Sequence, residues 1–181
     1  QGRDIRLAEE RIKGYRNFAN KIWNASRFVL MHASTSGPGR RPVEPGTFSL
    51  ADRWIQSRLN RLMGTVEEAF RGYLFNEVAH ALYQFIWHEL CDWYLEMIKP
   101  ILNQPDEAAE KQAAQHTMIE VMGASLQMLH PLMPFITEEI WQKLPCAKES
   151  IMISPYPAAD PEKIDAGAEE IMGLIIDVVN S

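Results

Sequence analysis

Apolar residues recur at helical spacing along most of the chain. Between Leu7 and Met31 they fall on one side at about 100° per residue, which predicts a first amphipathic helix. Its expected inward positions are Ile12, Tyr15, Phe18, Ala19, Ile22, Ala25 and Val29. Residues 32–47 hold three prolines and three glycines and are expected to form a loop. A second helix should begin after Ser49 as N-cap and end near Phe70. Its expected inward positions are Ala51, Trp54, Ile55, Leu59, Leu62 and Val66.

The pattern changes after Gly72. A third helix, capped by Asn76 and ending near Lys99, carries apolar or aromatic residues on most of its sides. Such a helix is typical of the centre of a fold, so we expect it to be the most buried one.

Prolines divide the second half of the sequence. Pro100 and Pro105 should bracket a turn, and a fourth helix is predicted from Asp106 to Leu129. The run HPLMP at 130–134 ends it, and a short helix should follow over 135–144. Residues 151–157 indicate an extended strap, and 161–181 an amphipathic helix. No segment shows strand alternation, so the predicted class is all-α, an antiparallel helical bundle. We expect residues 1–160 to form the bundle and 161–181 to start a truncated C-terminal segment.

Composition narrows the class of protein. Apolar residues make up 46% of the chain, which is enough for a core, but charges interrupt every candidate for a membrane span. The first residues show no apolar signal segment. Two cysteines, Cys91 and Cys146, are too few for a disulfide framework. These features favour a cytoplasmic protein.

The formal net charge of −6 is an average over two unlike halves. Residues 1–72 hold 13 basic and 7 acidic side chains, a charge of +6, whereas residues 73–181 hold 5 basic and 17 acidic ones, a charge of −12. A basic half on an otherwise acidic chain can form a nucleic-acid-binding face.

Catalytic and metal-binding signatures are weak. The chain contains no GxxxxGK[ST], GxGxxG or GxSxG motif. His88–Asp92 resembles HExxH but has Asp where the second zinc-ligating His is required. Glu77 and His80 form one ExxH pair, whereas a di-iron bundle needs two pairs and two further carboxylates. We therefore expect no catalytic residue, metal ligand or cofactor site. A carboxylate-bridged metalloprotein remains the less favoured alternative.

One charged residue is expected within an apolar face. Arg58 lies among the inward positions of the second helix, where an unpaired charge is costly. Glu89, Asp92 and Glu96 share one helical face at spacings of three and four. We expect a carboxylate of this stripe, with Asp92 as the candidate, to pair with Arg58.

The first helix carries a polar strip opposite its apolar side. Cations and amides alternate there without a carboxylate, which suits phosphate and base-edge contacts. The candidate RNA-binding residues of this helix are Arg16, Asn17, Asn24 and Arg27, followed by Lys13 and Lys21. Arg53 and Asn60, expected on the outward side of the second helix, are weaker candidates. Asn20, Arg71, Arg40 and Arg41 add to the same basic half. A solvated face, or a protein-interaction bundle without an RNA role, is the alternative.

Several motifs also resemble a known family. GYRNFANKIWNASRF at 14–28 is similar to the helix that follows the catalytic domain in valyl-tRNA synthetases, a family of class I aminoacyl-tRNA synthetases. LADRWI at 50–55, DWYLE at 92–96, HPLMPFITEEIW at 130–141 and SIM at 150–152 follow in that family's order. The HP…PF motif is shared with isoleucyl and leucyl relatives, so the first motif is the more specific one.

The resemblance implies an anticodon-binding helical bundle. The family's reaction is the ATP- and Mg-dependent attachment of valine to its tRNA, but the HIGH and KMSKS motifs of its catalytic domain are missing from this chain. The implied partners are valine tRNA and the catalytic and editing domains of the same polypeptide. Arg16 and Asn17 could therefore hold the bundle against the catalytic domain instead of contacting RNA.

Overall fold

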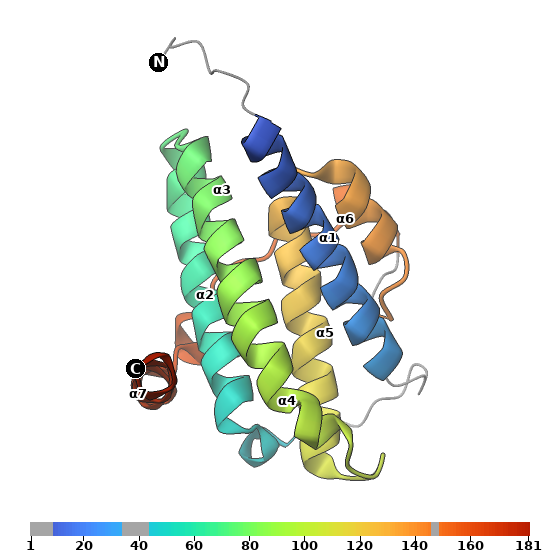
Figure 1. The fold of residues 1–181 in the computed structure, drawn as a ribbon, viewed down its shortest axis with the longest axis vertical. Helices are drawn as coiled ribbons and strands as arrows, with labels where there is room; N and C mark the ends of the chain where they lie inside the picture. The colour runs from blue at the N-terminus through green and yellow to red at the C-terminus, as the bar shows by residue number, and fades with distance from the viewer. Residues whose placement is uncertain (1–8, 34–43, 146–148) are drawn as a thin grey trace.

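The computed structural model describes residues 9–33, 44–145 and 149–181. Within these ranges all regular structure is helical, and four long rods run in alternating directions (Figure 1). The first rod is α1 (Glu9–His32), the second α2 (Leu50–Arg71), and the fourth α5 (Ala109–Leu129). The third rod is continuous from Phe75 to Leu102. The predicted all-α antiparallel bundle is confirmed. Most of the expected loop over 32–47, with Arg40 and Arg41, lies outside the described residues, as does Cys146.

The two ends of α2 follow from local sequence. Ser49 caps the helix by accepting a hydrogen bond from the Asp52 amide at 3.1 Å, and the Asp52 carboxylate accepts one from the Ser49 amide at 2.9 Å. This reciprocal capping box confirms the predicted start. The helix ends at Arg71 with Gly72 as its C-cap, and Tyr73 follows with φ of 56°, a left-handed conformation that reverses the chain into the third rod.

The third rod is α-helical at its ends and wider in its middle. It consists of α3 (Phe75–Gln84), a π-helical segment (Phe85–Tyr94) and α4 (Leu95–Leu102). The residue before the helix is Leu74, which makes no side-chain cap, so the predicted cap at Asn76 is wrong. Pro100 lies inside α4 rather than in the following turn.

The most buried helix is α5 rather than the third rod. Buried residues make up 14 of its 21 positions, and it contacts α1, α2, α3, α4 and α6 (Pro134–Trp141). The expectation that the third rod is central is therefore wrong. Small residues on α5, including Ala114, Gly123 and Ala124, let neighbouring helices approach on several sides, whereas aromatic residues of the third rod remain partly exposed.

The chain after α6 returns along α2. The strap includes a short turn at Ile151–Ile153 and leads through Pro161–Lys163 to α7 (Ala166–Asn180), which packs on α2 (Figure 1). Ala168 and Met172 of α7 join the main core. The division at residue 160 stays a prediction. No helix among the described residues is long and apolar enough to span a membrane.

Candidate nucleic-acid interface

One face of α1 carries cations and amides over about 21 Å, the rise between residues 13 and 27. Its members are all exposed: Lys13, Arg16, Asn17, Asn20, Asn24 and Arg27. We call these six residues the α1 strip. Neither Arg16 nor Arg27 forms an ion pair within the described part of the chain. No acidic residue occurs between Glu10 and Glu44, so the part of α1 from Arg16 to Arg27 contains no carboxylate.

The opposite side of α1 holds the helix in the bundle. The buried residues Phe18, Ile22, Ala25 and Val29 belong to the core. Ile12 and Tyr15, which were expected to face inward, are exposed, so the buried face of α1 begins at Phe18. Because α1 is anchored in this way, the α1 strip is presented on a rigid helix rather than on a loop.

Lys21 lies beside the α1 strip but contacts residues of the third rod. Its Nζ donates to Asp92 Oδ1 at 2.5 Å and lies 4.8 Å from the centre of the Trp87 ring. His88 Nδ1 approaches the other Asp92 oxygen at 3.1 Å. Asp92 therefore joins α1 to the third rod, and it partly neutralises Lys21.

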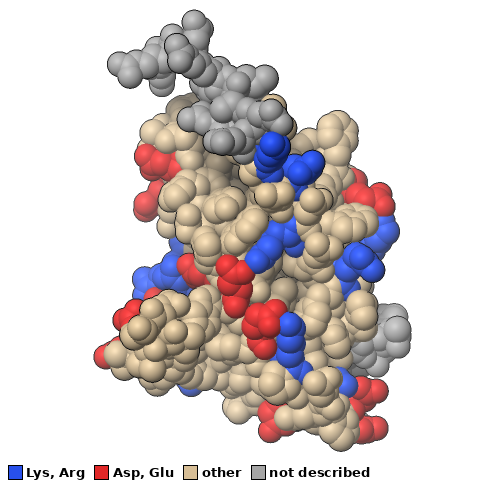
Figure 2. Space-filling model, in the orientation of Figure 1, with Lys and Arg blue, Asp and Glu red and all other residues tan. Residues whose placement is uncertain are grey.

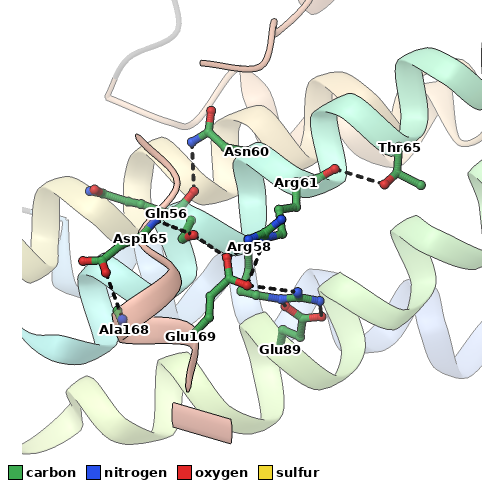
Figure 3. A network of polar contacts seen from close by, with 10 residues as sticks. Gln56, Arg58, Asn60, Arg61, Thr65, Glu89, Asp165, Ala168 and Glu169 are labelled. Carbon is green, nitrogen blue, oxygen red and sulfur yellow. Dashed lines mark hydrogen bonds and ion pairs between the residues drawn. The ribbon is translucent and has the colours of Figure 1, made fainter. Parts of the chain in front are cut away.

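The cations of α2 form a separate network with acidic residues of α7 and the third rod (Figure 3). Arg58 donates two hydrogen bonds to Glu89, at 2.7 and 2.8 Å, and Arg61 Nε donates to Glu169 at 2.7 Å. Ser57 donates a further bond to Glu169. Burial alone would raise the pKa of Glu169, but the bonds from Ser57 and Arg61 outweigh it, so the pKa lies below its usual value. This network binds three elements together.

The partner of Arg58 differs from the expected one. A carboxylate does pair with Arg58, but it belongs to Glu89, whereas Asp92 pairs with Lys21. The pKa of Arg58 is raised, and the hydrogen bond to Glu89 is the largest cause of this shift. The predicted stripe assumed α-helical spacing. In the π segment each turn contains more residues, so Glu89 and Asp92 point to α2 and α1 respectively.

Two of the weaker candidates are also engaged inside the fold. Asn60 was expected on the outward side of α2, but it is buried and accepts a 2.8 Å hydrogen bond from the Asp160 amide. That expected placement is wrong. Arg53 is exposed but pairs with Asp165 at 3.0 Å, at the start of α7. Arg53, Arg58, Arg61 and Arg71 of α2 all have carboxylate partners, whereas Arg16 and Arg27 of α1 have none among the described residues. On the face drawn in Figure 2, basic and acidic side chains lie interspersed.

Two aromatic residues of α1 lie at least partly exposed. Phe28 is half-buried, its ring lies 4.6 Å from that of His32, and Lys99 Nζ lies 6.0 Å from it. Trp23 is exposed, with Lys143 Nζ at 5.9 Å from its ring. In the sequence, the alternation of cations with aromatic residues over 14–28 could have indicated that these rings lie at the surface.

Metal-binding geometry is absent from the described residues, where no group of three or more His, Cys, Asp or Glu side chains gathers. Glu77 and His80 are both exposed on α3. Burial raises the pKa of the Cys91 thiol to about 12, so it is a packed side chain rather than a reactive thiolate.

The fold and sequence of the bundle match those of a known protein family. Residues 52–181 match the family model described as the anticodon-binding domain of tRNA ligase. The chain therefore belongs to this family.

Within the family, the chain corresponds to the anticodon-binding region of valine–tRNA ligases. It is 50% identical to the valine–tRNA ligase of Geobacter sulfurreducens, 44% to that of Geobacillus kaustophilus and 43% to that of Pseudothermotoga lettingae. Each match covers 99% of this chain but 20% of the relative. The chain thus spans about a fifth of the length of these relatives.

A solved structure supports the fold. The LeuRS of Agrobacterium radiobacter, in a ternary complex with tRNA and LeuAMS, matches 90% of this chain and 18% of its own length, with a TM-score of 0.62. At 18% sequence identity this likeness concerns the fold alone.

Proposed function

We propose that the α1 strip binds valine tRNA as part of a valine–tRNA ligase. The observation that carries the proposal is the contrast between the helices: Arg53, Arg58 and Arg61 of α2 are paired with carboxylates, whereas Arg16 and Arg27 have no ion-pair partner among the described residues. An exposed cation without a carboxylate partner can neutralise a phosphate without breaking an internal bond.

Amides complete the recognition chemistry of the α1 strip. Asn17, Asn20 and Asn24 are exposed, and their side chains make no hydrogen bond within the described residues. Each offers both a donor and an acceptor, which suits base edges in single-stranded RNA, whereas Arg16 and Arg27 suit phosphates. Lys13 lies on the same face, and Lys21 would contribute if RNA displaced it from Asp92.

The chemistry of the whole ligase would take place elsewhere in the polypeptide. In the proposed protein, ATP and Mg support attachment of valine to tRNA in the catalytic domain. The domain described here would supply binding energy from a remote part of the tRNA, which positions the reacting end. A cytoplasmic location remains part of the proposal.

The test compares two neutralised arginines in the full-length ligase. Arg27→Gln should weaken valine tRNA binding and lower the slope of log affinity against log salt by about 0.7, the value for one lost phosphate contact with a single strand. Arg71→Gln is the matched control, because Arg71 is exposed but lies at the far end of α2 and pairs with Glu67. Equal slopes for Arg27→Gln and the parent would remove Arg27 from the interface.

A further inference from the structure

A cavity of about 500 Å³ lies between α2, α5 and the strap, away from the α1 strip. Apolar side chains make much of its wall: Leu59, Met63, Ile119, Ala124 and Trp141. Trp141 donates its indole N–H to the Glu149 carbonyl at 2.9 Å, which fixes the ring in place. The volume suits a small organic molecule.

The cavity is built from fixed parts. The strap is attached on one side by Asn60, which accepts the Asp160 amide at 2.8 Å, and on the other by Gln127, which donates to the Pro155 carbonyl at 3.0 Å. Between these attachments Pro157 and Ala158 contribute only short side chains. Gly123 and Ala124 of α5, on the opposite wall, also have small side chains or none. The strap therefore crosses the helices without filling the cavity.

The charges in the wall favour a cation. Glu120 is balanced by Lys163, whose Nζ lies 3.3 Å from its carboxylate, and His116 lies 3.7 Å from the other oxygen. Asp160 also lines the cavity, and its carboxylate accepts the Glu162 amide but forms no ion pair with any described residue. With His116 neutral, the four ionisable groups of the wall carry a net charge of −1.

We propose that this cavity binds a small organic amine. Asp160 would meet the ammonium group, and Leu59, Met63 and the Trp141 ring would cover the apolar body. An aromatic ring and a carboxylate in one apolar hollow are the groups that recognise organic cations. No residue of the α1 strip lines the cavity, so this site is separate from the proposed tRNA-binding surface.

Two probes with the same ring and opposite charge test the proposal. The 181-residue chain, which has its own hydrophobic core, is titrated with 2-phenylethylamine and with 3-phenylpropanoate while the NMR signal of the Trp141 indole N–H is followed. The amine should bind with a Kd on the order of 1 mM, as expected for so small a ligand, and the acid at least 10-fold more weakly. Equal affinities, or no shift of the Trp141 signal with either probe, would overturn the proposal.

Three variants locate the amine. Asp160→Asn keeps an oxygen for the Glu162 amide and should weaken amine binding about fivefold to tenfold. Glu162→Gln removes the same charge from an exposed strap residue outside the cavity and should leave the Kd unchanged. Ala158→Trp, at an exposed position of the rim, should block binding while the helical content is kept. Equal Kd values in Asp160→Asn and Glu162→Gln, or full binding by Ala158→Trp, would place the amine elsewhere and refute the site.

Discussion

The guanidinium of Arg58 holds the carboxylate of Glu89 through two parallel hydrogen bonds, of 2.7 and 2.8 Å, which join α2 to the π segment. The Nη1 atom of the same arginine lies 3.8 Å from Glu169 of α7. One cation therefore stands between two carboxylates from different elements. Bidentate geometry makes this pair stronger than most partly exposed ion pairs.

Removal of the cation should cost more than removal of one carboxylate. Arg58→Ala leaves the Glu89 carboxylate without its partner and removes a cation near Glu169, so it should lower the free energy of unfolding by about 2 kcal/mol, whereas Glu89→Gln should lower it by about 1 kcal/mol. Urea unfolding of the two single variants and the double variant measures this. The double variant should be closer to Arg58→Ala than the sum predicts, and strict additivity would show that the two side chains do not interact.

Tyr94 and Asp52 form a buried link between the third rod and the start of α2. The Tyr94 hydroxyl donates to Asp52 Oδ1 at 2.7 Å, and both residues are fully buried. Burial, followed by the charge of Asp52, raises the pKa of Tyr94 well above its usual value. Tyr94→Phe should lower the free energy of unfolding by about 2 kcal/mol, because a buried carboxylate loses a donor.

A second tyrosine gives the control for that prediction. Tyr156 is exposed and makes no hydrogen bond within the described residues. Tyr156→Phe should change the free energy of unfolding by less than about 0.5 kcal/mol. A similar loss in both variants would mean that the effect of Tyr94→Phe is not the bond to Asp52.

Acidification should weaken the attachment of α7. The folded-state pKa of Glu169 lies below its unfolded value, so its stabilising contribution is complete above the unfolded pKa, near pH 4.3, and is lost as pH falls through the folded pKa. Glu169→Gln should therefore be less stable than the parent at pH 7, and this difference should shrink below about pH 4.3.

Urea unfolding at pH 7, 5, 4 and 3 checks the pH dependence. Glu170→Gln serves as the control, because Glu170 is exposed and unpaired among the described residues. Its difference from the parent should stay near zero at every pH. A Glu169→Gln difference that does not vary with pH would contradict the role assigned to the ionised carboxylate.

Helix positions and the α2 cap followed from local rules, because hydrophobic period, proline and the Ser49–Asp52 spacing act within a few residues. Of the wrong predictions, the Asn76 cap concerns a local feature, whereas the partner of Arg58 and the placement of Asn60 do not follow from local spacing. The π segment changes the direction of Asp92, and nothing in local spacing marks that widening. Asn60 is buried because the strap, 100 residues later in the chain, returns over α2.

The candidate site shows the same division. Exposure of Arg16, Asn17, Asn24 and Arg27 agrees with the α1 period. Whether a cation is neutralised depends instead on acidic residues remote in sequence, such as Glu169 for Arg61 and Asp165 for Arg53. The sequence could therefore place the α1 strip but could not separate its available cations from the paired ones on α2.

Arg16 provides the last prediction, since it could contact either RNA or another part of the ligase. Arg16→Gln in the full-length ligase should lower the salt slope of tRNA binding by about 0.7 if Arg16 contacts a phosphate of single-stranded RNA. The melting temperature without tRNA should then be unchanged, because the exposed guanidinium has no partner in the described fold. A contact with another domain predicts the reverse: a lower melting temperature without tRNA and an unchanged slope.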